Sequence, residues 1–312
     1  MSSEPTIEIT EERLQSWLDQ FVSDHIDRFS LVTVGLSNVT YAVTCASGER
    51  YVVRKLDSQA TSSVTAEALI QQTLVERGLS SPLYLPSHTG EFVGRDGGNV
   101  FTVSRHLAGE HPASLTLELA ASFGETLAQI HDALDATLID LPENRGQWLN
   151  PRNVVAEITR CPAPAQAKLQ PILERSAPLF DAELPQAIIH GELAANNVFA
   201  AAQRVTTIFD FENAEHAPRL LDLAYTYVSM VYDEQLDPAE LLSALRGGYD
   251  GAAEMPLTPV EIAEIPRAVG FTATAASAWC HARGMSDYGE QFLRSVRDPS
   301  VQTATRSQCC DM

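Results

Sequence analysis

The sequence is poor in cysteine and has no long apolar run, and each absence excludes a class of protein. Five cysteines occur among 312 residues, with no C-x-x-C spacing, so neither a disulfide framework nor a zinc site is expected. No run of about 18 apolar residues is present that could span a membrane. Residues 1–5 lack the basic and apolar segments of a signal peptide. We therefore expect a cytoplasmic protein with free thiols and no membrane partner.

Positive charge is also scarce. Arginine and lysine together number 21 against 41 acidic residues, for a formal net charge of −20. Residues 1–106 hold 8 of the basic and 13 of the acidic side chains, so most of the negative charge lies after residue 106. Such a chain is a poor binder of nucleic acid, which we exclude as a partner. The acidity favours ligands that carry an amine.

The chain up to residue 106 is mostly β in character. Short runs rich in Val, Thr and Tyr, separated by turn residues, predict strands, and one apolar pattern at helical spacing predicts a helix. The order is β-β-β-α-β-β, after a short helix that Thr10 can cap. The predicted strands are residues 30–34, 41–44, 50–56, 90–93 and 99–105, and the helix between the third and fourth is residues 61–77.

Helices dominate after residue 106, with a compact β region between them. The patterns predict helices at residues 115–134, 162–179, 218–232, 240–245 and 260–283, and strands at residues 187–190, 198–201 and 205–211. An apolar content of 45% with 20% charged residues fits a globular chain. We expect an α+β protein with an N-terminal domain (1–106), a C-terminal domain (107–298) and a mobile tail (299–312).

Polar residues that can carry chemistry gather between residues 188 and 224. One predicted strand ends in His190-Gly191, and Glu192 follows it, with Asn197 five residues further on. The next apolar strand ends in Asp210. We expect the ends of these two strands to be neighbours, so that two carboxylates and an amide meet. These groups are the hard oxygen ligands that Mg²⁺ prefers. The same set can place a carboxylate against a substrate hydroxyl, as phosphoryl transfer requires.

This run resembles the H-G-D-x-x-x-x-N and I-D-F signatures of the aminoglycoside phosphotransferase-like kinases, a family that includes choline, homoserine and methylthioribose kinases. The matching residues are His190, Gly191, Asn197, Ile208, Asp210 and Phe211, with Phe209 as one extra position, and Asp222-Leu223-Ala224 matches a downstream D-L-A. The resemblance implies a bilobal protein-kinase-like fold with a small antiparallel-sheet N-lobe and a mainly helical C-lobe. It also implies transfer from ATP or GTP to a small-molecule hydroxyl, with Mg²⁺ held by Asn197 and Asp210.

The family keeps a cation at the end of its third strand, and the run Tyr51-Val52-Val53-Arg54 resembles that strand. Strand alternation places Val52 and Arg54 on one face, so the resemblance implies that Arg54 contacts the nucleotide phosphates. Lys55 points the other way and is the alternative cation. Glu67, early in the following helix, stands where the family has the acid that pairs with this cation. The alternative to the phosphate contact is that Arg54 is a solvated strand residue. The alternative to the ion pair is that Glu67 is an exposed acid on the helix.

Two further segments are expected to touch the nucleotide. The loop of residues 35–39, with Ser37 and Asn38, could cover phosphates with backbone N–H groups and small side chains, although most such loops are turns. The resemblance implies that backbone atoms from Arg105 to Leu107 form the hinge that binds adenine.

Glu192 departs from the family pattern, which has aspartate at this position. Glutamate keeps the charge but moves the carboxylate by about 1.5 Å, one bond length. Three interpretations stay open: a pocket rebuilt around the longer catalytic residue, a nucleotide-binding pseudokinase with a regulatory role, or an engineered substitution. Because Asn197 and Asp210 are both present, we favour an active kinase.

The acceptor is expected to lie against the acidic C-terminal part of the chain. Asp210-Phe211-Glu212 resembles the D-F-E stretch of choline and homoserine kinases, which makes Glu212 and Glu215 the candidate substrate residues. An amine-bearing alcohol is the first expectation, with aminoglycosides second. The alternative is that these acids form a solvated surface.

Overall fold

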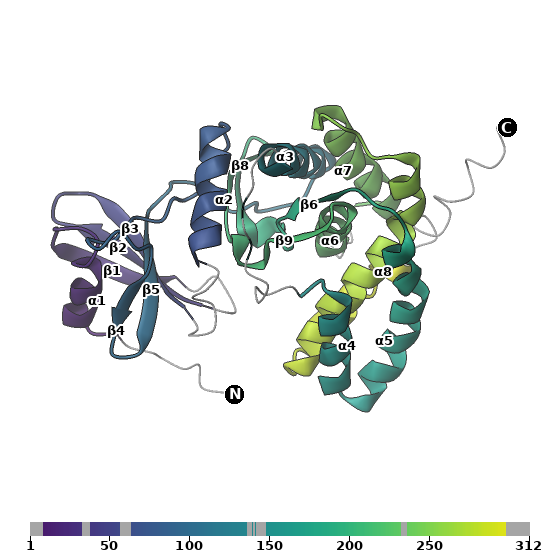
Figure 1. The fold of residues 1–312 in the computed structure, drawn as a ribbon, viewed down its shortest axis with the longest axis horizontal. Helices are drawn as coiled ribbons and strands as arrows, with labels where there is room; N and C mark the ends of the chain where they lie inside the picture. The colour runs from purple at the N-terminus through teal and green to yellow at the C-terminus, as the bar shows by residue number, and fades with distance from the viewer. Residues whose placement is uncertain are drawn as a thin grey trace. The chain divides into compact units, whose positions relative to one another are not determined.

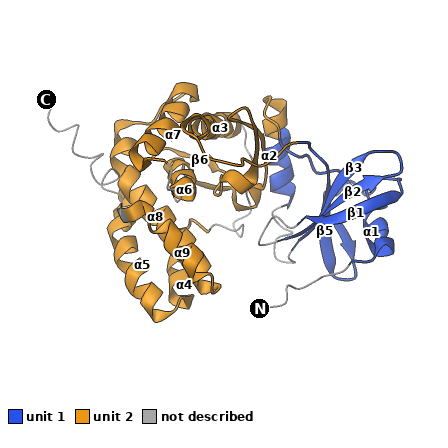
Figure 2. Cartoon of the chain, turned by 180° about the vertical axis from the view of Figure 1, so that it is seen from behind, with its two compact units in different colours: residues 1–72, 81–108 blue, residues 73–80, 109–312 orange. Residues whose placement is uncertain are grey.

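The chain divides into two compact units in the computed structural model, which describes residues 9–32, 38–56, 64–135, 139, 141, 148–231 and 236–297. Unit 1 comprises residues 1–72 and 81–108, and unit 2 comprises residues 73–80 and 109–312 (Figure 2). We propose that these units are the two expected lobes. The expected tail, residues 299–312, lies outside the described residues.

Unit 1 is built on a five-stranded antiparallel sheet with the strand order β1-β2-β3-β5-β4. Helix α2 (Val64–Glu76) follows β3, so the predicted order β-β-β-α-β-β is confirmed. The fourth strand was predicted at residues 90–93 but begins at Gly94. Gly90, with a φ of +87°, lies in a turn before this strand. The strands are β1 (Ile26–Val32), β2 (Val39–Cys45), β3 (Arg50–Leu56), β4 (Gly94–Asp96) and β5 (Asn99–Arg105).

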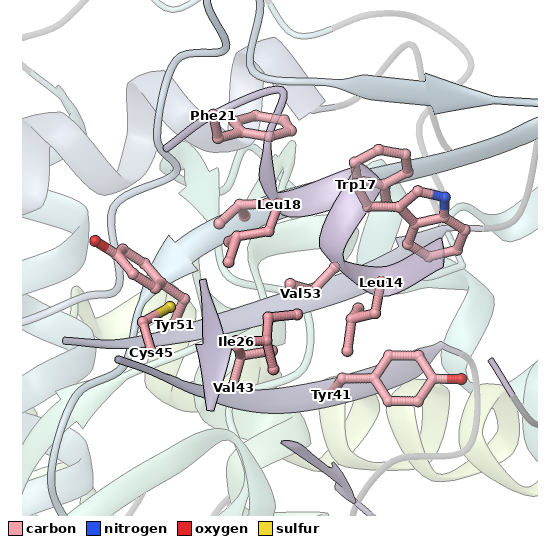
Figure 3. Close-up of a cluster of buried hydrophobic side chains, with 12 residues drawn as sticks. Leu14, Trp17, Leu18, Phe21, Ile26, Tyr41, Val43, Cys45, Tyr51 and Val53 are labelled. Carbon is pink, nitrogen blue, oxygen red and sulfur yellow. The ribbon is translucent and has the colours of Figure 1, made fainter. Parts of the chain in front are cut away.

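Helix α1 (Glu11–Leu18) covers one face of this sheet and supplies its core. Thr10 accepts a hydrogen bond from the Arg13 amide over 3.3 Å, which confirms the predicted cap. Trp17 stacks on Phe101 with ring centroids 4.4 Å apart. Figure 3 shows the α1 side chains packed over the apolar residues of the strands. The opposite face of β3 is therefore the one that carries Val52 and Arg54.

Unit 2 is mainly helical (Figure 1), and its longest helix, α8 (Pro259–Ala282), is largely buried. A capping box between Thr258 and Glu261 starts this helix. None of the helices in the described ranges is long and apolar enough to cross a membrane. The other helices are α3 (Leu117–Asp135), α4 (Pro151–Arg160), α5 (Ala163–Ser176), α6 (Leu220–Met230), α7 (Pro238–Ala252) and α9 (Ser286–Phe292).

The β region of unit 2 corrects one expectation. The strands that precede Glu192 and Asp210 were expected to be neighbours, yet β6 (Gln186–Ile189) pairs with β9 (Glu215–Pro218), whereas β7 (Val198–Ala201) pairs with β8 (Arg204–Ile208). The two segments are joined beyond their strand ends instead, where a ring nitrogen of His190, Nε2, lies 2.8 Å from the Phe209 carbonyl oxygen.

Candidate active site

The loop after β6, which we call the catalytic loop (residues 190–197), is anchored from beneath by Asp222 of α6. The fully buried Asp222 carboxylate accepts hydrogen bonds from the His190 and Gly191 amides, each over 2.7 Å. Its Oδ2 also lies 3.0 Å from Nε2 of the buried His131. Three partners thus fix this carboxylate, and it in turn fixes the start of the loop.

Glu192 follows Gly191 in the catalytic loop, and its side chain is half-buried. Its Oε2 accepts a hydrogen bond from Asn213 Nδ2 over 2.7 Å. Burial raises the pKa of Glu192 to about 7, with additional repulsion from Asp210 and Glu212, and the Asn213 bond opposes the rise. A carboxyl that titrates near neutrality is suited to accept a proton from a substrate at cellular pH.

Asn197 is buried at the end of the catalytic loop, in the short 3₁₀ turn η3 (Ala195–Asn197). Its Nδ2 donates to the Glu192 carbonyl oxygen over 2.9 Å, and its own carbonyl accepts from the Phe209 amide over 2.9 Å. With the amide nitrogen engaged inside the loop, the oxygen Oδ1 is the atom that Asn197 can offer to a cation.

Asp210 follows Phe209 with a φ of 64°, in the left-handed region, where aspartate is tolerated better than most residues. It begins the 3₁₀ turn η4 (Phe211–Asn213), in which the buried Phe211 ring packs 4.5 Å from His190. The structure therefore brings Glu192, Asn197 and Asp210 together by packing one loop against the other.

The two candidate substrate acids have different surroundings. Glu212 lies in η4, close enough to Glu192 to raise its pKa. Glu215 lies on β9 opposite Ile189 and is only 6% exposed. A hydrogen bond from the Leu149 amide reaches Glu215, but its Oε1 has no hydrogen-bond partner among the described residues. Burial, with repulsion from Asp222, raises the pKa of Glu215 to about 7.

Glu215→Gln is expected to stabilise the protein at pH 8 and to leave its stability at pH 4 almost unchanged. Because burial raises the pKa of Glu215 from 4.5 to about 7, ionisation in the folded state costs stability as the pH rises between those values. The cost is at most about 3 kcal/mol. Urea unfolding at the two pH values measures it, with the exposed Glu183→Gln as the control. Equal destabilisation at both pH values would contradict the assignment.

The residues expected to bind nucleotide lie in unit 1. Arg54 Nη1 is 3.6 Å from Glu67 Oε1 of α2, and also 3.5 Å from the Tyr84 hydroxyl. Glu67 is 2% exposed, so this pair is shielded from solvent. Lys55 occupies the opposite face of β3, as strand alternation requires. The role of Arg54 toward phosphates stays a prediction.

The remaining predicted nucleotide residues are spread over unit 1. Ser37 lies outside the described residues, and Asn38 is half-buried just before β2. Arg105 ends β5, is exposed, and pairs with Glu49 (Nη1–Oε2 distance 2.6 Å). Leu107 is half-buried in the segment that follows. The hinge expected from Arg105 to Leu107 also stays a prediction.

Sequence reasoning missed Asn213 and the contact of Trp148 with the catalytic loop. Trp148 Nε1 donates to the Gly191 carbonyl oxygen over 3.1 Å. Asn213 follows Asp210 by three positions and matches no motif. The pairing of β6 with β9, which brings Asn213 to Glu192, has no local sequence signal.

Known proteins resemble this chain in sequence and in fold. The model of the phosphotransferase enzyme family matches residues 28–257. A homoserine kinase from Pseudomonas aeruginosa is 28% identical over 259 residues, which cover 81% of this chain and 80% of the relative. An amicoumacin kinase in complex with AMP-PNP and Ca²⁺ superposes with a TM-score of 0.74 at 13% identity, covering 93% of this chain and 94% of that one. A microcompartment-associated aminopropanol kinase gives a TM-score of 0.65 at 20% identity, with 94% of each chain covered.

The two structural likenesses concern the fold, which is that of the protein-kinase-like phosphotransferases, and the expected α+β architecture is confirmed. The match to the family model covers most of the chain. The chain therefore belongs to the phosphotransferase enzyme family, as a small-molecule kinase that uses a hydroxyl group as acceptor.

Proposed function

We propose that the protein transfers the γ-phosphoryl group of ATP to the hydroxyl of a small amine-bearing alcohol, with Glu192 as the catalytic carboxylate. The observation that carries this proposal is the position of Glu192. It is half-buried, it has a pKa near neutrality, and it lies beside Asn197 and Asp210. We propose ATP as the phosphate donor, in place of GTP, because a solved protein of this fold binds the ATP analogue AMP-PNP.

The donor set at this site fits Mg²⁺. A carboxylate from Asp210 and an amide oxygen from Asn197 are hard oxygen ligands, and Mg²⁺ in phosphotransferases is held by one or two such groups together with phosphate oxygens and waters. Repulsion between Asp210 and Glu192 is a charge imbalance that a cation would relieve. When bound, Mg²⁺ supplies charge stabilisation to the phosphate oxygens.

The residues of the chain position the reactants. Arg54, paired with Glu67, would contact the nucleotide phosphates. Glu192 Oε1 or Oε2 accepts a hydrogen bond from the acceptor hydroxyl, orients its oxygen and takes its proton late. A loose phosphoryl-transfer transition state demands orientation more than strong base catalysis. Asp222 keeps the loop in place through the His190 and Gly191 amides.

An amine-bearing acceptor is supported by the charge of the site. Glu212 lies near Glu192, and Glu215 keeps a buried carboxylate oxygen without a hydrogen bond among the described residues. A buried charge that lacks a partner costs stability, and a ligand ammonium group would compensate it. Homoserine and aminopropanol, named in the relatives and neighbours, are both alcohols that carry an amine.

A thermal-shift series tests the acceptor class. Melting is measured with Mg²⁺ and AMP-PNP plus homoserine, 1-amino-2-propanol or an aminoglycoside, and with propane-1,2-diol as the matched alcohol without an amine. The amine-bearing alcohols are expected to raise the melting temperature above the value with nucleotide alone. A larger shift with the diol than with its amine counterpart would contradict the proposed acceptor class.

A pseudokinase with a regulatory role is the second candidate, because glutamate stands where the family has aspartate. It predicts nucleotide binding with no phosphate transfer to any acceptor. The Asn213 bond to Glu192, which places the longer side chain, favours the active enzyme.

Arg54→Ala is expected to weaken nucleotide binding by about 10- to 100-fold, the loss that follows removal of a charge-assisted contact. Lys55→Ala is the matched control, because Lys55 lies on the opposite face of β3, and it should change the affinity little. Titration calorimetry with Mg²⁺ and AMP-PNP measures both. The reverse ranking would assign the phosphate contact to Lys55.

A further inference from the structure

Asn213 holds the carboxylate that departs from the family pattern. Its Nδ2 donates to Glu192 Oε2 over 2.7 Å in a partly buried setting. An ionised carboxylate accepts hydrogen bonds and donates none, so the amide must present its nitrogen to Glu192.

The backbone around Asn213 fixes its distance from the catalytic loop. The turn closes with a hydrogen bond from the Ala214 amide to the Phe211 carbonyl oxygen over 3.1 Å, and Glu215 then pairs with Ile189 in the ladder that leads to Glu192. Gly191 packs against the same turn, since a Cβ there would lie only 2.5 Å from the Asn213 carbonyl oxygen. Asn213 is thus held at a set position beside the loop.

Because glutamate has one more methylene than aspartate, the hydrogen bond from Asn213 is needed to fix the orientation of the Glu192 carboxylate. One more rotatable bond gives the carboxylate more orientations than aspartate has. A hydrogen-bond donor at a fixed place, such as Asn213 Nδ2, selects one of them. An aspartate at position 192, shorter by about 1.5 Å, would leave Asn213 Nδ2 beyond hydrogen-bonding distance.

We propose that Asn213 is a positioning residue that adapts this site to a glutamate, by fixing the Glu192 carboxylate where the acceptor hydroxyl must be oriented. The proposal rests on the proposed function, because it requires Glu192 to be the catalytic carboxylate. It predicts that Asn213 matters to turnover only while position 192 is glutamate.

A double-mutant cycle tests this dependence. Steady-state kcat and KM for ATP are measured by ADP formation, with homoserine as the acceptor and with water alone, for the wild type, Asn213→Ala, Glu192→Asp and the double variant. Asn213→Ala is expected to lower kcat by about 10-fold, the loss of a hydrogen bond to a charged group, with the KM for ATP unchanged. The double variant should equal Glu192→Asp within about 2-fold.

Structural and functional failures give different results in this experiment. If Asn213 only stabilises the turn, its replacement lowers the melting temperature and multiplies the loss caused by Glu192→Asp, which would overturn the proposal. Unchanged kcat in Asn213→Ala would overturn it too. No ADP formation by the wild type would instead refute the proposed function, and the proposal with it.

Two further variants guard against misfolding and unspecific effects. Asn213→Ser keeps a small polar turn residue whose hydroxyl is too short to reach Glu192, so it should show the same loss of kcat as Asn213→Ala. Gln170→Ala removes an exposed amide from α5, outside the site, and should leave kcat unchanged. A loss with Gln170→Ala as large as with Asn213→Ala would contradict the proposal.

Discussion

Asp210→Asn is expected to lower Mg²⁺-dependent phosphate transfer by at least about 10²-fold while the protein stays folded. Asparagine tolerates the left-handed conformation that Asp210 adopts at φ 64°, so the backbone of the turn is kept and only the charge is lost. Metal-ion stabilisation of a transferring phosphoryl group amounts to several kcal/mol, and about 1.4 kcal/mol corresponds to tenfold in rate. Initial rates over a range of Mg²⁺ concentrations at saturating ATP give the effect.

Asp181→Asn is the control for this experiment, because it removes an exposed carboxylate that lies outside the site. Its rate and its Mg²⁺ dependence should match those of the wild type. An Asp210→Asn protein with an unchanged rate and an unchanged Mg²⁺ requirement would remove Asp210 from the proposed metal site.

Glu192→Gln is expected to lower kcat by about 10²- to 10⁴-fold, the range for loss of a catalytic acid–base group. Glutamine retains an oxygen that can accept the Asn213 hydrogen bond, so the loop geometry and the nucleotide affinity should persist. Rapid-quench measurement of phosphate transfer, together with calorimetric nucleotide affinity, separates chemistry from binding. Full activity in Glu192→Gln would show that another residue orients the acceptor.

Glu192→Asp distinguishes two accounts of the departure from the family pattern. The adapted pocket inferred from the Asn213 contact predicts a fall of about 10²-fold, because a misplacement of about 1 Å can cost that much. A damaging departure predicts that the family's own aspartate raises turnover. The direction of the change therefore decides between the two accounts.

The close approach of Glu192, Asn197 and Asp210 could be predicted because these residues are near one another in sequence. His190, Glu192, Asn197 and Asp210 lie within about twenty residues, and the strands before them carry a plain apolar signal. The order of elements in unit 1 was also predicted, because turns that contain glycine and polar residues separate its strands. The N-cap at Thr10 is a further local signal that the structure confirms.

The contacts that complete the site could not be predicted, because they depend on pairing between distant segments. Strand β9 is four residues long and includes Glu215, His216 and Pro218, a composition that does not predict a strand, yet its pairing with β6 brings Asn213 to Glu192. Helix α4 was missed because it starts at Asn150-Pro151, where a turn is an equally good interpretation, and its first turn is polar. The expectation that the strands before Glu192 and Asp210 are neighbours was wrong for the same reason.

Direct detection of the phosphorylated acceptor tests the central claim. The wild-type protein is incubated with Mg²⁺, ATP and an amine-bearing alcohol such as homoserine or 1-amino-2-propanol, beside Glu192→Gln, and the products are followed by ³¹P NMR. The account predicts a new phosphomonoester resonance that grows with ADP in the wild type and is nearly absent in the variant. Nucleotide binding by the wild type without a phosphomonoester on any acceptor of this class would contradict it.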